Sequence, residues 1–360
     1  DLKEFHREVN DTSKNNNEVV ILVSNLTIQF GSKKIVDDVS FEIKKGEING
    51  FLGISGAGKT TIIRVLTCQI KNKYWKGKVL INGLSPAKSG NKSKILATIG
   101  YVPQLEETNI YYELTPMQNV EIFASTFGIN SKNAKKRAEE LFKILDIPKD
   151  TWNNATTYMS GGEKKRLSVA LGMINNPQIL FLDEPTTGVD ASKRYDILNY
   201  LKGINQKFGT TLLLITHDLE AANICDTVAI LAAGKLVAFG NPVQFINSLP
   251  GNGRIIRLRI HELDDKVIEK IASIPFVAVI SRVGNDTVEL FIYGYDSNYS
   301  ILVKHLIEMG ILPDEISQDK ASFKRYFQLR IKSKSFFDKL SSKEKINIEE
   351  NHDIEEELTG

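Results

Sequence analysis

The segment from Gly53 to Thr61 constrains the fold of this chain more than any other, because it places a glycine-rich loop and a Lys-Thr pair between two apolar runs. The apolar residues up to Leu52 predict a strand, and the run from Ile62 to Leu66 predicts the start of a helix. A strand, a glycine-rich loop and a helix in this order form a phosphate-binding loop. The sequence therefore predicts phosphate binding here, against the alternative of an ordinary glycine turn before a helix.

The residue types of this loop suit a nucleotide phosphate. Glycines let successive backbone N–H groups turn inward around an anion, and the N-terminus of the helix adds a partial positive charge. The side chain of Lys59 can reach β- and γ-phosphates, and the hydroxyl of Thr60 suits a Mg²⁺ ligand. The candidate nucleotide-binding residues of the loop are Gly53, Ser55, Gly56, Ala57, Gly58, Lys59, Thr60 and Thr61.

The composition excludes several classes of protein. With 360 residues, of which 42% are hydrophobic and 25% charged, the chain can form one large globular domain and a smaller one, or two of middle size. A net charge of +2 gives no basis for a nucleic-acid partner. Cys68 and Cys225 fit neither a disulfide framework nor a metal site, which indicates a reduced, intracellular compartment. No apolar run approaches the ~18 residues of a membrane helix, so a membrane role requires a span from another chain.

Two acidic residues follow a second apolar run. The residues Ile179 to Leu182 predict a buried parallel strand that ends at Asp183 and Glu184. Open α/β sheets hold their ligands at the carboxyl ends of their strands. Asp183 fits a Mg²⁺ shell and Glu184 fits a base that orients water, whereas the plain alternative is a solvated turn.

Three further segments carry candidate residues, each with a plain structural alternative. Ser160-Gly161-Gly162-Glu163 precedes a predicted helix, and is either a second anion site or a tight turn whose serine caps the helix. Phe30 ends a predicted strand and either packs in the core or stacks on an adenine ring. His217 follows the predicted strand Thr211–Thr216, and is either an incidental turn residue or a site residue that ends a strand as the acids do.

These segments stand in the order and spacing found in the ATP-binding-cassette (ABC) ATPases, and residues 19–242 resemble that family throughout. The glycine-rich loop matches the Walker A motif. The run Ile179–Glu184 looks like Walker B with its catalytic glutamate. Gln104, in the sequence Tyr-Val-Pro-Gln, resembles the Q-loop, and His217 resembles the switch histidine.

Two more motifs complete the resemblance, and one loop departs from it. Ser160–Glu163 is similar to the LSGGQ signature, with Met159 in place of leucine and glutamate in place of the final glutamine. Thr187–Asp190 resembles the D-loop. The loop Lys71–Trp75 differs from the short glycine turn that usually follows the first helix in this family.

The resemblance implies a fold, a reaction and a set of residue roles. The fold is α/β: a P-loop ABC nucleotide-binding domain with a RecA-like mixed sheet core, an antiparallel β subdomain and a helical subdomain. The reaction is hydrolysis of ATP with Mg²⁺, in a head-to-tail dimer that holds ATP between the P-loop of one subunit and the signature of the other.

The residues that the resemblance implies in catalysis are Glu184, His217, Lys59 and Gln104. Those implied at Mg²⁺ are Thr60, Gln104 and Asp183. Outside the P-loop, those implied at ATP or across the dimer are Phe30, Ser160, Gly161, Gly162, Glu163 and Asp190.

Within the family, Leu114–Val120 and Asp183–Asp190 look like the exporter ATPases for drugs, lipids, polysaccharides or ions. These pair an ATPase with a separate membrane permease, so the resemblance implies a place on the cytoplasmic face of the cell membrane and a second ATPase subunit. All motifs are intact, which favours a homodimer without excluding an unequal partner. An importer ATPase shares every catalytic motif and stays an alternative. A soluble ABC mechanoenzyme acting on ribosomes or DNA is disfavoured by the single cassette and the lack of a basic surplus.

The chain predicts four regions. Residues 1–17 are a polar lead-in that we expect to be disordered, and residues 18–248 form the ABC domain. After the linker signal Pro250–Gly253, residues 254–332 predict strands and helices in the order β-α-β-β-α-β and a final helix, a small α+β ferredoxin-like accessory domain. Residues 333–360 are basic and then acidic, and read as a disordered tail or, less simply, a binding arm.

Overall fold

The computed structural model describes residues 18–332 and 346–348, and the chain divides into two compact units, Asp1–Phe239 and Gly240–Gly360. The predicted disorder of residues 1–17, 333–345 and 349–360 lies outside the described residues. None of the described helices is both long and apolar enough to cross a membrane.

The first unit is built on a six-stranded sheet with the order β5-β6-β7-β3-β8-β9. Its strands are β3 (Ile48–Leu52), β5 (Ile99–Val102), β6 (Ile179–Asp183), β7 (Thr211–Thr216), β8 (Thr227–Ala232) and β9 (Lys235–Gly240). The pairs β5–β6, β6–β7, β7–β3 and β3–β8 are parallel. Every residue of β3, β6 and β7 is buried, which explains why these strands are such continuous apolar runs in the sequence.

A three-stranded antiparallel sheet with the order β2-β1-β4 packs on the same core. Its strands are β1 (Val19–Phe30), β2 (Lys33–Lys44) and β4 (Trp75–Ile81). The ring of Phe41 in β2 meets the ring of Phe51 in β3 edge-on, with centroids 4.8 Å apart. The antiparallel subdomain and the parallel sheet therefore share one hydrophobic core.

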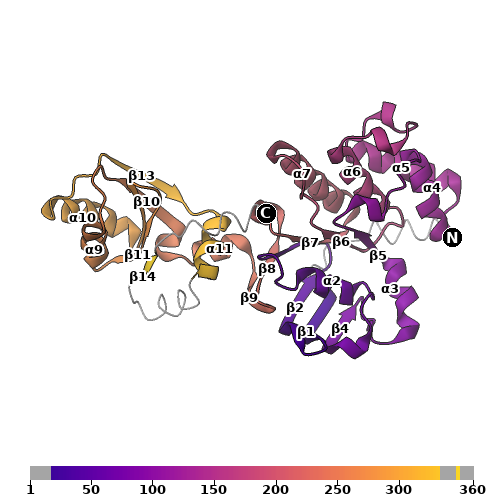
Figure 1. Ribbon diagram of the computed structural model, residues 1–360, viewed down its shortest axis with the longest axis horizontal. Helices are drawn as coiled ribbons and strands as arrows, with labels where there is room; N and C mark the ends of the chain where they lie inside the picture. The colour runs from indigo at the N-terminus through magenta and orange to yellow at the C-terminus, as the bar shows by residue number, and fades with distance from the viewer. Residues whose placement is uncertain (1–17, 333–345, 349–360) are drawn as a thin grey trace. The chain divides into compact units, whose positions relative to one another are not determined.

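Six α-helices accompany these sheets among the described residues of the first unit. They are α2 (Lys59–Leu66), α3 (Lys92–Thr98), α4 (Pro116–Thr126), α5 (Ser131–Ile144), α6 (Gly161–Gly172) and α7 (Ala191–Phe208). The short 3-10 helices of the chain are η1 (Asn72–Tyr74), η2 (Ser89–Asn91), η3 (Glu106–Thr108), η4 (Lys149–Thr151), η5 (Thr156–Tyr158), η6 (Leu219–Ile224) and η7 (Pro250–Gly253). Helices α4, α5 and α6 lie together, apart from β1, β2 and β4 (Figure 1).

One predicted strand is partly wrong. The sequence predicts a strand from Ile95 to Val102, but residues up to Thr98 belong to α3 and only Ile99 to Val102 form β5. In α3 the side chain of Ile95 is buried while that of Leu96 is exposed, so one apolar residue meets the core and its neighbour faces outward. A short run of β-branched and apolar residues does not separate these two conformations.

The second unit contains a five-stranded sheet with the order β13-β10-β12-β11-β14. Its elements are α8 (Pro242–Asn247), β10 (Arg254–Arg259), α9 (Asp265–Ser273), β11 (Val277–Arg282), β12 (Thr287–Ile292), α10 (Tyr295–Glu308), β13 (Glu315–Lys320), α11 (Phe323–Lys332) and β14 (Ile346–Ile348). From β10 to α11 this is the element order that the sequence predicts. The rings of Phe245 in α8 and Tyr326 in α11 are stacked with centroids 5.1 Å apart, so α8 packs within this unit, although the sequence assigns it to the ABC domain.

The sequence predicts a disordered tail over residues 333–360, and this is wrong for residues 346–348. Residues 346–348 form β14, which pairs in parallel with β11 at the edge of the sheet. An edge strand presents unpaired backbone groups, and the alternating Ile-Asn-Ile sequence can satisfy them as one more strand.

Candidate functional site

The carboxyl ends of β3, β6 and β7 bring the main predicted site residues to one edge of the sheet. The parallel register pairs Leu52 with Thr216 and Asp183 with Ile215. The glycine-rich loop follows β3, the acidic pair ends β6, and His217 follows β7. Groups far apart in the sequence therefore meet where open α/β sheets bind ligands.

The glycine-rich loop has the backbone conformation that an anion site needs. Gly56 and Gly58 have φ values of +75° and +95°, which favour glycine. A Cβ on Gly58 would lie 3.0 Å from Cγ2 of Val36, so β2 closes tightly over the loop. No side chain caps α2 at Gly58, and its first N–H groups are therefore available to a phosphate.

Lys59 supplies a buried positive charge beside this loop. Lys59 is 6% exposed, and its Nζ donates to the carbonyl oxygens of Gly53 at 2.6 Å and Ile54 at 3.0 Å. Burial lowers the pKa of Lys59, and the nearby charges of Glu184 and Asp183 oppose that shift. Within residues 18–332 it forms no ion pair, so the donor set fits a phosphate.

Thr60 and Asp183 form the candidate Mg²⁺ site. The hydroxyl of Thr60 donates to Oδ1 of Asp183 at 3.1 Å, and the hydroxyl of Tyr101 donates to Oδ2 at 3.4 Å. Burial raises the pKa of Asp183, partly offset by the Thr60 hydrogen bond, and burial also raises the pKa of Tyr101 to about 12. A carboxylate and a hydroxyl are hard oxygen ligands, and Mg²⁺ typically takes few protein ligands beside substrate phosphates, so this pair fits the ion.

Glu184 is held in an unusual conformation by three donors. Its φ is +52°, a left-handed value that is uncommon for a residue with a Cβ. Its Oε2 accepts hydrogen bonds from Oγ1 of Thr187 at 3.0 Å and from Oγ1 of Thr216 at 3.1 Å. Nδ1 of His217 lies 3.0 Å from the same oxygen. The backbone strain at Glu184 is thus compensated by contacts that fix the carboxylate at the edge of the sheet.

Phe30 lies outside the hydrophobic core. It is 40% exposed at the end of β1, and its ring centroid is 5.2 Å from that of Tyr74. Tyr74 belongs to the loop that departs from the family pattern, and the sequence gives no reason to place it beside Phe30. Phe30 pairs with Lys33 in β2, three positions before the Val36 that touches the P-loop. At about 3.3 Å per strand residue, the backbone positions of Lys33 and Val36 are about 10 Å apart along β2.

The signature and D-loop residues lie on exposed helix starts. Ser160 caps α6: its N–H donates to Oε2 of Glu163 at 2.7 Å, and its hydroxyl accepts from the N–H of Glu163 at 3.3 Å. Asp190 caps α7 by accepting a hydrogen bond from the N–H of Lys193. Hydrogen bonds from the backbone and the side chain of Lys193 lower the pKa of Asp190. No hydrogen bond within the described part of the chain joins Ser160–Glu163 to the P-loop. Of the two alternatives that the sequence leaves for Ser160–Glu163, the structure shows the helix cap.

Gln104 lies two residues beyond β5, next to the edge where β6 ends. Its carbonyl oxygen accepts a hydrogen bond from Nζ of Lys165 at 2.8 Å.

Sequence reasoning missed Lys165, Thr187 and Thr216 as neighbours of the site. A lysine in a charged run is typical of a solvated surface. The two threonines lie close in sequence to Glu184 and His217, and it is the acid and the histidine that indicate a catalytic site.

Comparison with known proteins agrees with this geometry. The family model described as ABC transporter matches residues 36–187. The methionine import ATP-binding protein MetN 1 of Oceanobacillus iheyensis is 35% identical over 253 residues, covering 68% of this chain and 73% of that protein. The linearmycin resistance ATP-binding protein LnrL of Bacillus subtilis is 30% identical over 259 residues, covering 72% of this chain and 80% of that protein.

A solved structure shares the fold of the first unit. It is the dimeric post-hydrolysis state of the ATP-binding cassette MJ0796 bound to ADP and Pi, with a TM-score of 0.55 and 27% identity, covering 61% of this chain and 98% of that one. The sequence relatives extend over more than two thirds of both chains, and the P-loop lies within the matched residues. The chain therefore belongs to the ABC transporter family, as an ATP-binding subunit that hydrolyses ATP.

Proposed function

We propose that this chain drives a separate membrane permease, in the direction of export, through ATP-dependent closure of a dimer. The observation that carries the proposal is the convergence of Lys59, Thr60, Asp183, Glu184 and His217 at one sheet edge. Phosphoryl transfer needs positioning and charge stabilisation more than covalent chemistry, and these residues supply both.

The first step is binding and orientation of ATP. Lys59 moves its hydrogen bonds from the carbonyls of Gly53 and Ile54 to the phosphates, and the N–H groups at the start of α2 complete the cradle. Thr60 and Asp183 would hold Mg²⁺, and the ion would neutralise developing charge on the phosphates. The exposed side of Phe30 stacks on the base.

The second step is attack by water. Three donors bind Oε2 of Glu184, and we assign to Oε1 the task of orienting the water and taking its proton. His217 holds the carboxylate and faces the γ-phosphate. Gln104 would reach Mg²⁺ through its side chain and would carry the state of the nucleotide to the partner.

The exposed helix starts support a dimer. Ser160, Gly161 and Asp190 are exposed, and α6 begins with backbone N–H groups that favour an anion. We propose that these groups complete the ATP site of a second copy. The relative MJ0796 was solved as a dimer bound to ADP and Pi, which supports this arrangement.

The direction of transport rests on the Leu114–Val120 and Asp183–Asp190 motifs and on the relative named for linearmycin resistance. Import is the second candidate, because the methionine import relative has the higher identity. We further propose that residues 254–332 form a ferredoxin-like accessory domain. The strand order β13-β10-β12-β11, with α9 and α10 as crossovers, supports it.

The permease partner is tested by co-purification. Tagged full-length Glu184→Gln protein is isolated from native cells in mild detergent with ATP, and a polytopic membrane protein should accompany it. Leu105 follows Gln104 in the chain and is 60% exposed, so Leu105→Ser should reduce that recovery, whereas Leu312→Ser, at an exposed leucine of the second unit, should not. Recovery of ribosomes or nucleic acid alone would overturn the proposal. Transport assays in vesicles with the recovered permease then decide between export and import.

A further inference from the structure

Lys165 is a buried charge in the helix that carries the signature. It lies five residues after Ser160, and only 1% of it is exposed. Its Nζ donates to the carbonyl oxygen of Gln104 at 2.8 Å and lies 2.9 Å from Oε1 of Glu106. A buried ammonium costs free energy unless it is paired and hydrogen-bonded. These contacts therefore fix the backbone of Gln104 relative to α6.

A second contact lies one helical turn further along the same face of α6. The hydroxyl of Ser168, fully buried, donates to Oδ1 of Asn109 at 3.0 Å. Residues three apart in a helix are neighbours on its surface, so Lys165 and Ser168 hold the two ends of one segment. We call residues 104–109 the Gln104 segment. It contains η3 and is bound to α6 at both ends.

The chain before the signature is bound to the same loop. The N–H of Thr156 donates to the carbonyl of Leu114 at 2.9 Å, and the N–H of Thr157 donates to that of Tyr112 at 2.9 Å. The fully buried Asn119 bonds both backbone groups of Tyr111 and lies 3.3 Å from the Thr156 hydroxyl. The loop after Gln104 and the approach to Ser160 thus form one hydrogen-bonded body.

The opposite end of α6 is packed on the core sheet. A Cβ on Gly100 of β5 would lie 2.0 Å from the carbonyl oxygen of Gly172, so the two backbones touch. Asn175 donates to the carbonyl of Ile99 at 3.1 Å. At 1.5 Å per residue, about 16 Å separate this contact from Gly161, and Lys165 lies about 6 Å from Gly161. A rotation of α6 about Gly172 would carry Ser160 and the Gln104 segment together.

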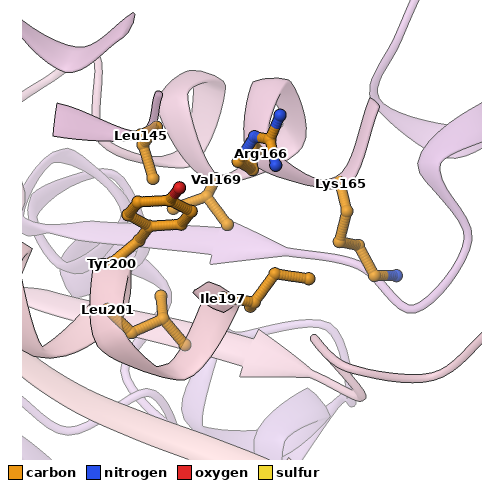
Figure 2. Close-up of a pocket in the computed structure, with 7 residues that line it drawn as sticks. All are labelled: Leu145, Lys165, Arg166, Val169, Ile197, Tyr200 and Leu201. Atoms are coloured by element: carbon orange, nitrogen blue, oxygen red, sulfur yellow. The ribbon is translucent and has the colours of Figure 1, made fainter. Parts of the chain in front are cut away.

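Among the described residues, Nζ of Lys165 has two partners, the carbonyl oxygen of Gln104 and Oε1 of Glu106. Lys165 and Arg166 leave α6 in different directions beside a hollow between α6 and α7 (Figure 2). The hollow has no room for a water molecule. The ammonium is therefore committed to Gln104 and Glu106.

We propose that Lys165 is a positioning residue that couples the Gln104 segment at one ATP site to the signature that α6 presents to the ATP site of a second copy. The inference rests on the proposed function, since it takes Gln104 as the residue that senses nucleotide and Ser160 as a contact across the dimer. ATP at the P-loop shifts Gln104, and Lys165 transmits the shift to the start of α6. Dimer closure then depends on Lys165, whereas binding of ATP to a single subunit does not.

The test separates ATP binding from ATP-dependent closure. The parent is full-length Glu184→Gln protein, and Lys165→Met is added to remove the ammonium while keeping the length of the side chain. Lys143→Met, an exposed lysine of α5, is the matched control. ATP affinity is measured by titration at a protein concentration too low for dimers. The ATP concentration for half-maximal dimerisation is measured by sedimentation velocity, and the unfolding midpoint by heating.

We expect Lys165→Met to leave the affinity of the single subunit within about twofold and to raise the ATP concentration for dimerisation by about tenfold or more, a coupling of ordinary size. The control should match the parent. Unchanged dimerisation in folded Lys165→Met protein would overturn the inference. An equal loss of ATP affinity and of dimerisation would also overturn it, because Lys165 would then only support the structure of the ATP site of its own subunit.

Ser168→Ala keeps the test decisive if Lys165→Met does not fold. It removes the second contact without leaving a charge, and should raise the ATP concentration for dimerisation about threefold to fivefold, the value of one hydrogen bond. No change there would overturn the coupling. A parent that binds ATP without dimerising would instead overturn the proposed function, and the binding titration distinguishes that case.

Discussion

The hydroxyl of Thr60 donates to Oδ1 of Asp183 at 3.1 Å, although the two residues are 123 positions apart in the chain. The contact joins the first turn of the P-loop helix to the end of β6, which β7 separates from β3 in the sheet. It brings a hydroxyl and a carboxylate together at the site that we propose for Mg²⁺. The carboxylate is buried, and burial of its charged form costs free energy.

That cost predicts how stability depends on pH. Burial raises the pKa of Asp183, so the folded chain holds this proton to a higher pH than the unfolded chain. The free energy of unfolding then falls as pH rises through the raised pKa, and the contribution is most unfavourable above it. In metal-free buffer, Asp183→Asn should unfold at a higher temperature than wild type at pH 8, and the difference should shrink as the pH falls toward 3.8, the ordinary pKa of aspartate. Equal midpoints at pH 8 would contradict the prediction.

Lys59→Ala should weaken ATP binding by about tenfold or more, because it removes a charge-assisted donor from the phosphates. Isothermal titration calorimetry measures the affinity directly. Lys143→Ala, which removes an exposed lysine of α5, is the matched control and should bind ATP as wild type does. Unchanged affinity in Lys59→Ala protein would show that the glycine-rich loop is not the phosphate cradle.

Thr216→Val should lower the turnover of ATP while leaving its binding intact. Valine keeps the shape of the buried threonine but removes one of the three donors to Oε2 of Glu184. The loss of one such hydrogen bond, about 1 kcal/mol, corresponds to about a fivefold lower kcat. Steady-state kinetics should show this fall with KM within about twofold, as expected for an interaction that acts on the transition state. A change in KM alone would argue against this role.

Tyr74→Ala should weaken ATP binding by about threefold to fivefold, since an aromatic pair contributes about 0.5–1.5 kcal/mol beyond its buried area. The ring centroid of Tyr74 lies 5.2 Å from that of Phe30, and its loss leaves the ring that we propose to stack on the base free to turn. Tyr74→Phe should bind as wild type does. Binding of inorganic tripolyphosphate, which has no base, should be the same in all three proteins; an equal loss for tripolyphosphate would place the defect in the phosphate cradle.

The sequence predicts the sheet edge well because short-range patterns determine it. Buried parallel strands are continuous apolar runs, and the residues that follow them must share one edge once the strands pair in parallel. Lys59, Asp183, Glu184 and His217 are found together for that reason. The serine cap at Ser160 is equally local, and it forms as its sequence indicates.

What the sequence does not predict depends on contacts between distant segments. Lys165 stands in a run of three basic residues, and only the fold shows that it is buried against Gln104 while Arg166 takes another direction. Tyr74 reaches Phe30 because β4 pairs with β1. The strand β14 forms only because the edge of β11 is available to it.

The role of Glu184 is tested most directly by comparing ATP hydrolysis and dimerisation in wild-type and Glu184→Gln protein. Glutamine keeps the size of the side chain but cannot take a proton from water. We expect the variant to bind ATP as tightly as wild type, to stay dimeric in ATP, and to hydrolyse it about 10²- to 10⁴-fold more slowly. Wild-type turnover in the variant would contradict the assignment of Glu184 as the base that orients water.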